Sequence, residues 1–224
     1  CGSGIVPYVY SKDVYVCGVQ WSIGLEMALL AKDHMRCYLT TDHPNAGPFT
    51  RYPRVMKWLM SQKARDEVFA TMKNEDKVRD RSTLSNIDRE LTLYEIAQMT
   101  RAGPAKTLGL GGKLGGLKVG MQADIAVYPY NPETESDPEQ IEWAFSNAKY
   151  LIKSGEIIVN DSEIVSNGNK QTYWVNVATN PSKQVEHDLN EYFRKYYSVS
   201  RRNYEVDEHA FMKNPNVISI DATQ

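Results

Sequence analysis

The sequence has few cysteines, no long apolar run and no block of like charge. Its three cysteines, Cys1, Cys17 and Cys37, are widely spaced and form no C-x-x-C pair, so neither a disulfide framework nor a cysteine zinc site is predicted. No apolar run approaches the roughly 18 residues of a membrane span. The 26 basic and 28 acidic residues nearly balance, which argues against nucleic acid or a membrane surface as the main partner. We expect a cytoplasmic protein with reduced thiols.

Histidine pairs of the kind that bind metals are also absent. The four histidines form no H-x-H or H-x-x-x-H pair, and a zinc site needs three or four nitrogen, sulfur or oxygen ligands. The first residues, CGSGIVP, have neither an initiator methionine nor the charged-then-apolar plan of a signal peptide. We therefore expect the chain to be a portion of a longer protein.

The strongest chemical candidate is an aspartate that follows a short apolar run. Residues 36–41 (RCYLTT), with β-forming residues at 38–41, predict a buried strand, and Pro44, Gly47 and Pro48 prevent its continuation. Asp42 would then lie at a strand end, where it can bind a metal or accept a proton from water. A structural aspartate in a turn or helix cap is the alternative.

Three neighbours of Asp42 are candidates for binding a substrate. His43 can donate a hydrogen bond to a developing oxyanion, and Asn45 and Arg51 can supply an amide and a guanidinium to a carboxylate or carbonyl group. Each has a plainer interpretation as an ordinary loop or surface residue, because loops are rich in asparagine and surface arginines are common.

The patterning changes along the chain and predicts three parts. Apolar residues at helical spacing and the capping-box pattern TLYE at 92–95 predict helices over about 19–32, 53–73 and 92–101, the last ended by Gly103 and Pro104. Later apolar runs predict antiparallel strands at 125–128, 150–152, 157–159 and 173–177, with hairpin turns at 153–156 and 160–163 and a surface loop over 129–142. A helix is predicted over about 183–197. We divide the chain into an α/β part (1–110), an antiparallel β part (111–178) and a helical tail (179–224).

The glycine-rich segment at 109–118 (GLGGKLGGLK) superficially suggests a phosphate-binding loop. It lacks the G-K-[ST] ending and the strand-before, helix-after setting that such a loop requires. Tight turns between strands are the better interpretation.

Two segments together resemble the amidohydrolase superfamily. MTRAGPAKTLGL at 99–110, followed by GLKVGMQADIAVY at 116–128, is similar to a long family signature, and Asp42 resembles the aspartate at the end of the eighth barrel strand. A finer resemblance, over about residues 1–175, is to the A-subunit family of formylmethanofuran dehydrogenases and their bacterial formyltransferase/hydrolase relatives. It rests on WSIGLE at 21–26, LTTDHPNAGPFTRYP at 39–53 and IDRELTLYEIA at 87–97.

The resemblance implies a zinc-dependent amidohydrolase on a (β/α)8 barrel that carries a small β-sandwich. By it, the chain is the carboxy-terminal portion, with the last barrel strand and its helices in 1–110, part of the sandwich in 111–178, and a helix and extended tail beyond. The implied reaction interconverts N-formylmethanofuran with formate and methanofuran during CO2 reduction in methanogenesis, beside molybdenum- or tungsten-containing and iron–sulfur subunits.

Family members hold two zinc ions with an H-x-H pair, a carboxylated lysine, two further histidines and the late aspartate. Only the aspartate has a matching position here, Asp42, so the resemblance implies an incomplete zinc site and an inactive isolated fragment. Two other interpretations stay open. A related cyclic-amide hydrolase would share the PAKTLGL and ADI segments but not the DHPNAGPFTRYP loop, and a non-enzymatic platform for other subunits would lack metal even at full length.

Overall fold

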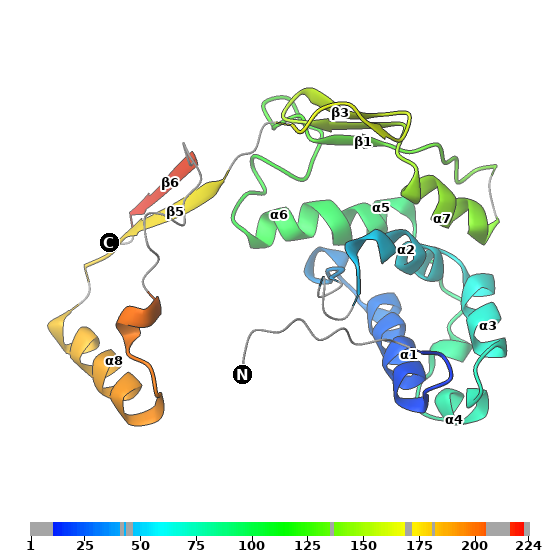
Figure 1. Cartoon of the computed structure of the whole chain (residues 1–224), viewed down its shortest axis with the longest axis horizontal. Helices are drawn as coiled ribbons and strands as arrows, with labels where there is room; N and C mark the ends of the chain where they lie inside the picture. The colour runs from blue at the N-terminus through cyan, green and yellow to red at the C-terminus, as the bar shows by residue number, and fades with distance from the viewer. Residues whose placement is uncertain are drawn as a thin grey trace. The chain divides into compact units, whose positions relative to one another are not determined.

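The computed structural model describes residues 11–40, 43, 47–134, 137–168, 172–180, 182–204 and 216–221. These residues form two compact units, one within 1–168 and one within 169–224 (Figure 1). The three-part division at 110 and 178 stays a prediction. Among the described residues, no helix has the length and apolar character that crossing a membrane requires.

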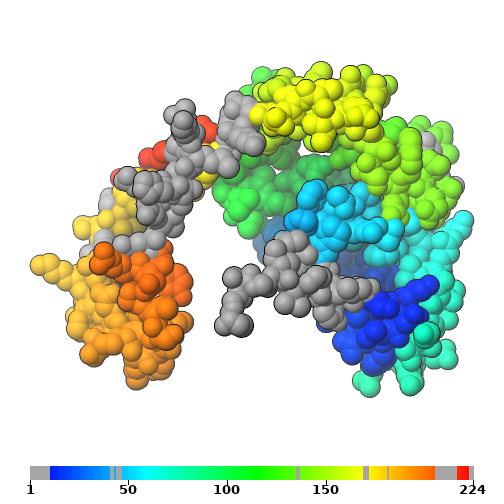
Figure 2. Space-filling view, viewed as in Figure 1, coloured from blue at the N-terminus to red at the C-terminus, as the bar shows by residue number. Residues whose placement is uncertain are grey.

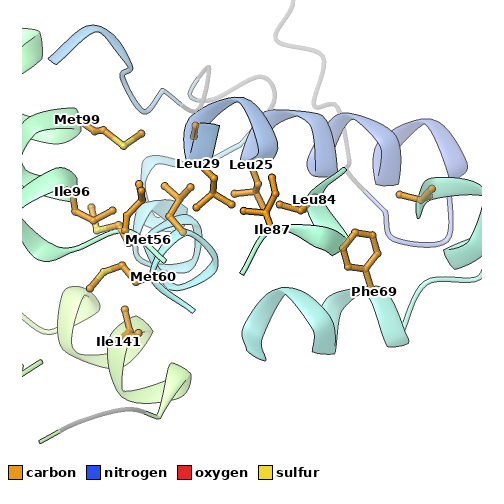
Figure 3. Close-up of a cluster of buried hydrophobic side chains, with 14 of the residues drawn as sticks. Leu25, Leu29, Met56, Met60, Phe69, Leu84, Ile87, Ile96, Met99 and Ile141 are labelled. Carbon is orange, nitrogen blue, oxygen red and sulfur yellow. The ribbon is translucent and has the colours of Figure 1, made fainter. Parts of the chain in front are cut away.

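The first unit begins with short helices. They are α1 (Tyr15–Leu30), η1 (His34–Arg36), η2 (Phe49–Arg51), α2 (Tyr52–Met60), α3 (Gln62–Ala70), α4 (Glu75–Arg79), η3 (Leu84–Asn86), α5 (Leu93–Ala97), the π-helical turn η4 (Gln98–Ala102) and α6 (Gly103–Thr107). The apolar faces of α1 to α5, η3 and η4 meet in one core, to which α7 (Pro138–Ser146) adds Ile141 (Figure 3). Leu29, Leu59, Phe69 and Met99 are fully buried there.

Helix α1 is confirmed, but only part of its predicted apolar stripe is buried. The predicted stripe contains Val19, Ile23, Met27 and Leu30 and is widened by Leu25 and Leu29. Met27 and Leu30 are 69% and 57% exposed, whereas Leu25 and Leu29 are buried. The helix is apolar on nearly every side, so periodicity alone does not choose a face. Gly18 decides it, because a β-carbon there would lie 2.9 Å from a methyl group of Val78. Only the side with small residues allows this close approach of helices.

The helix predicted over 53–73 is two helices. Ser61 has extended backbone angles (φ −143°, ψ 116°), and its hydroxyl accepts a hydrogen bond from the Ala64 amide at 3.2 Å, which caps α3. Serine at such a position satisfies one of the free amides that begin every helix. The chain therefore turns at Ser61 while the apolar pattern continues across the break.

The β part of the first unit is a four-stranded antiparallel sheet in the order β1-β2-β3-β4. The strands are β1 (Ile125–Val127), β2 (Tyr150–Lys153), β3 (Glu156–Asn160) and β4 (Glu163–Ile164). Ile125 lies opposite Ile152, and Leu151 opposite Val159. The predicted strands and both hairpins are confirmed here. A facing second sheet, which a sandwich requires, is not found among the described residues of this unit.

The surface loop predicted over 129–142 is wrong in its second half, where α7 begins. Asp137 accepts a hydrogen bond from the Glu139 amide at 3.2 Å, and Pro138 occupies the first helical position. Both are helix-start signals, since the aspartate caps a free amide and proline needs no amide partner there. The acidic and proline-rich composition concealed this start.

Helix α7 is joined to α2 by ion pairs. Arg54 Nε lies 2.9 Å from a Glu142 carboxylate oxygen, and Lys57, which is 9% exposed, binds both Glu139 at 2.8 Å and Glu142. These contacts join the part of the unit that carries the sheet to the helical part, across the boundary predicted at residue 110.

The α2–α7 ion pairs predict a pH-dependent stability. Burial alone would raise the pKa of Glu142, but hydrogen bonds from Lys57 and Arg54 hold that pKa below its ordinary value. Such a carboxylate stabilises the fold above its unfolded pKa of about 4.3, and the contribution is lost as the pH falls through the folded pKa. We expect the urea midpoint to fall between about pH 5 and pH 3, and to fall less steeply for Glu142→Gln. Glu67→Gln, at an exposed position on α3, should keep the wild-type slope, and equal slopes for all three would contradict the prediction.

The second unit contains β5 (Tyr173–Ala178), α8 (Lys183–Tyr196), η5 (Arg201–Tyr204) and β6 (Asn216–Asp221). The helix predicted over 183–197 is confirmed as α8. Strand β5 is also confirmed, but it pairs in parallel with β6, with Val175 opposite Ile218, and does not join the antiparallel sheet. A parallel pair needs a crossover connection, which α8 supplies.

Candidate functional site

The predicted site spans residues 42–51, and the structure describes part of it. Asp42 and Asn45 lie outside the described residues, so their placement stays a prediction. His43 and Arg51 are described, and both are exposed. The His43 ring meets the Phe49 ring edge-to-face, with centroids 4.9 Å apart, and Arg51 ends η2 directly before α2.

The segment that leads to Asp42 is extended but unpaired. Residues 34–36 form η1, and Cys37 has extended angles (φ −117°, ψ 120°), yet residues 37–40 join no sheet. The strand predicted over 36–41 is therefore not formed among the described residues. A strand needs a neighbour to satisfy its amides and carbonyls, and no described residue of this chain offers one to this segment.

The extended segment is held by side chains and not by a ladder. The Tyr38 hydroxyl donates to the Met35 carbonyl at 3.0 Å and hydrogen-bonds the hydroxyl of Thr107 in α6. Gly103, the first residue of α6, lies so close that an added β-carbon would be 2.8 Å from both the Met35 carbonyl oxygen and the Tyr38 ring. Residues 103–107 thus position the base of the predicted catalytic loop.

The prediction that Gly103 and Pro104 end a helix is wrong. Residues 93–107 stay helical, through α5, the π-helical turn η4 and α6. Proline lacks the amide that would bond the carbonyl four residues earlier, here that of Thr100, and its ring crowds that carbonyl. A π-turn widens the helix at this point, and the Arg101 guanidinium donates to the Thr100 carbonyl at 3.3 Å.

Substitution of Gly103 tests this close packing. We expect Gly103→Ala to lower the free energy of unfolding by about 1–3 kcal/mol, because two of the three nearest atoms are backbone carbonyl oxygens that cannot move independently. Gly24→Ala is a matched control, since Gly24 is helical, exposed and has nothing within 4 Å of an added β-carbon. The Gly24→Ala variant should raise the free energy of unfolding by about 0.5–1 kcal/mol. Urea denaturation compares the two, and equal effects would contradict the prediction.

The buried histidine of the first unit has a structural role. His34 Nε2 lies 3.1 Å from the Ala28 carbonyl, and Nδ1 lies 3.6 Å from a Glu95 oxygen. Burial alone would raise the pKa of Glu95, but the Thr92 amide and hydroxyl, with Arg89 and His34, hold it below its ordinary value. The predicted capping box of Thr92 and Glu95 is confirmed. These groups are satisfied within the fold and leave little capacity for a ligand.

The described residues do not by themselves provide enough ligands for a zinc ion. Among residues 11–40, 43, 47–134, 137–168, 172–180, 182–204 and 216–221, no three histidine, cysteine, aspartate or glutamate side chains gather as a metal site needs. Three or four such ligands are required.

The comparison with known families decides the class. Residues 16–159, more than half of the chain, match the amidohydrolase family. The chain belongs to the amidohydrolase family. The matched stretch includes the Tyr38, Gly103 and Thr107 contacts described above.

The chain is similar to a particular group of proteins within the amidohydrolase family. The chain is 48% identical over 225 residues to Protein FwdA of Methanocaldococcus jannaschii, and 38% identical over 213 residues to the A subunit of the formyltransferase/hydrolase complex Fhc of Methylorubrum extorquens. These matches cover 99% and 95% of this chain but only 39% and 37% of the relatives. The crystal structure of the FhcABCD complex from Methylorubrum extorquens with methylofuran is also similar, with a TM-score of 0.73 and 34% identity over 95% of this chain and 38% of that one.

Asp124 and Glu26, which lie in the segments that resemble known families, each hold a loop in place through their carboxylates. Asp124, in the ADI segment, accepts hydrogen bonds from the Ser154 amide at 2.8 Å and from Gln122 at 2.9 Å, and it pairs with Lys153. It thereby holds the β2–β3 turn, where Ser154 and Gly155 both have positive φ, as a tight hairpin requires.

Glu26, in the WSIGLE segment, holds another loop. Its carboxylate accepts from the Ser82 hydroxyl at 2.7 Å and from the Thr83 amide and hydroxyl at 2.9 and 2.8 Å. The Ser82 hydrogen bond is the main cause that keeps the pKa of Glu26 below its ordinary value. Sequence reasoning found both segments by resemblance but not these roles, because each depends on residues 29 or more positions away.

Proposed function

We propose that this chain is part of an amidohydrolase subunit that interconverts N-formylmethanofuran with formate and methanofuran, in the CO2 reduction of methanogenesis. The observation that carries the proposal is the 48% identity to Protein FwdA across 99% of this chain. The name of the Methylorubrum extorquens relative gives it a formyltransferase/hydrolase activity, and the similar crystal structure contains methylofuran. The names of the second relative and of the similar crystal structure support a formyl group on a furan-type amine as the substrate.

Four residues would act on that substrate. Asp42 would accept the proton of the attacking water and return it to the amine nitrogen as the C–N bond breaks. His43 would donate a hydrogen bond to the carbonyl oxygen as it gains charge, and Asn45 and Arg51 would hold the formyl or formate group. The exposure of His43 and Arg51 leaves both side chains available for such contacts.

Zinc would need ligands beyond the described residues. When bound, it would supply a Lewis acid for the carbonyl group, and we propose two zinc ions in the intact protein with Asp42 as one ligand. The described residues gather no three ligands of their own, so we expect the 224-residue chain alone to bind no zinc tightly and to be inactive. Molybdenum- or tungsten-containing and iron–sulfur subunits are the proposed partners, in the cytoplasm.

The test measures formate release from N-formylmethanofuran by the full-length protein that contains this sequence, with the 224-residue chain in parallel. We expect turnover and bound zinc only at full length. Turnover of cyclic amides such as hydantoins, without turnover of N-formylmethanofuran, would contradict the proposed substrate. Full activity of the 224-residue chain would contradict the incomplete site.

A further inference from the structure

Helix α8 presents a stripe of apolar and aromatic side chains to solvent. Val185, Leu189, Tyr192 and Tyr196 are 50%, 42%, 52% and 60% exposed within the described residues. Their spacings of four, three and four residues place all of them on one helix face, as in the seam of a two-helix coiled coil. No side chain of α8 is buried in this part of the structure.

The aromatic contacts of the second unit centre on Phe193 and Tyr197, and Tyr192 of the stripe lies at their edge, with its ring centroid 6.0 Å from that of Tyr197. Phe193 stacks on Tyr197, with ring centroids 5.0 Å apart, and meets the Tyr204 ring of η5 at 5.6 Å. Side chains of α8 and η5 gather in the gold and orange part of Figure 2. These contacts leave each side chain of the stripe at least 42% exposed within the described residues.

Two opposite charges flank the stripe on the same edge. Asp188 and Lys195 are seven residues apart, so they project from the same side of the helix two turns apart. Asp188 accepts a hydrogen bond from Gln184 at 2.7 Å, and the Lys195 ammonium lies 5.0 Å from the Tyr196 ring centroid. Within the described ranges, neither charge has an ion-pair partner.

We propose that α8 binds α8 of a second copy of this chain, antiparallel, about a two-fold axis. In an antiparallel pair the same flank of each helix faces its counterpart, so Asp188 of each copy meets Lys195 of the other. A parallel pair would instead set this flank against the flank with Glu186 and Phe193, and no opposite charges would meet. The charge pattern is self-complementary only in the antiparallel arrangement.

The same alignment fills the seam. With the axis between residues 190 and 191, Leu189 packs on Tyr192 of the second copy, and Val185 packs on Tyr196, each twice. The outer tyrosines keep their hydroxyl groups at the solvent-facing ends of the seam, where an amphipathic ring is favourable. The pairing does not depend on the proposed activity.

The contact is small, so we expect reversible dimerisation. Four side chains from each copy bury less than the roughly 1,200 Å² of a standard interface, and a Kd on the order of 10 μM is expected. Sedimentation velocity of the 224-residue chain from about 1 to 100 μM brackets that value. A monomer throughout that range would overturn the proposal, whether the stripe is covered by another part of the chain or by a different subunit.

Leu189→Arg is the first test variant, because it places a charge in the middle of the seam. It should leave the chain monomeric across the range. Asn190→Arg adds the same charge on the opposite, exposed side of α8 and should dimerise like the wild type. Circular dichroism checks that both variants keep their helix content. A dimer that persists in Leu189→Arg would overturn the assignment of the surface.

A charge exchange tests the orientation. Asp188→Lys alone and Lys195→Asp alone should each raise Kd about 5–10-fold, since each loses two ion pairs and sets like charges together. The double variant restores opposite charges across the axis and should return to within about twofold of the wild type. Both residues are exposed, and circular dichroism checks that the variants keep their helix content. Failure of the double variant to recover would overturn the antiparallel pairing.

Discussion

Asp42→Asn in the full-length protein is expected to reduce formate release from N-formylmethanofuran by about 10²–10⁴-fold, the usual contribution of a positioned acid–base group. Asparagine has nearly the shape of aspartate but accepts no proton. The loss should appear in kcat more than in KM if Asp42 acts mainly in the transition state. Steady-state kinetics with a formate assay measure both parameters.

Zinc content and a second variant sharpen the test of Asp42. Loss of zinc together with activity would mark Asp42 as a ligand, and loss of activity with zinc retained would mark it as the acid–base group alone. Asp80→Asn is the control, because Asp80 is an exposed aspartate at the end of α4. It should change the rate less than twofold. A full-length Asp42→Asn protein with more than a tenth of the normal rate would contradict both roles.

Arg65→Met is expected to lower the free energy of unfolding by about 3–5 kcal/mol. Arg65 is 1% exposed, and its guanidinium donates to the carbonyl oxygens of Trp58 at 2.8 Å, Ile87 at 3.0 Å and Arg89 at 2.9 Å. Methionine keeps much of the aliphatic volume but leaves these carbonyls without donors. The end of α2 and the segment after η3 would both lose their tie to α3.

Two further variants separate the hydrogen bonds of Arg65 from its charge. Arg65→Lys keeps the charge but replaces a planar fork by a single ammonium, so we expect a loss between those of wild type and Arg65→Met. Lys63→Met, at an exposed position on the same helix, should change stability by less than about 0.5 kcal/mol. Urea denaturation followed by circular dichroism measures all three. A loss below about 1 kcal/mol for Arg65→Met would show that the carbonyls find other donors.

Local signals predicted several elements well. The Thr92–Glu95 capping box, the hairpin turn at Ser154–Gly155 and the bounds of α8 are confirmed. Each depends on atoms within one or two turns of chain, where hydrogen-bond chemistry and backbone preference act directly. The amidohydrolase class was likewise readable from two signature segments, and the family match confirms it.

Other predictions failed where distant residues decide the outcome. The apolar pattern over 53–73 continues across Ser61, although the helix does not. The Gly103–Pro104 stop was overruled by a π-turn that fits α6 against residues 35–38. At Ser61 and at Gly103–Pro104 the residue types disfavour an uninterrupted α-helix. Packing against other parts of the chain determined whether the helix broke or continued.

The sequence by itself determined helices α1 and α8, the capping box and the hairpins, the absence of a cysteine or histidine metal motif, and the family to which the chain belongs. Tertiary structure alone decided which face of α1 is buried, how Tyr38 and Gly103 hold the segment before Asp42, and that Arg65 donates to three carbonyls. The physical reason is the distance along the chain over which each effect acts. Propensity and capping act over a few residues, whereas burial and the pairing of polar groups depend on contacts between residues far apart in the chain.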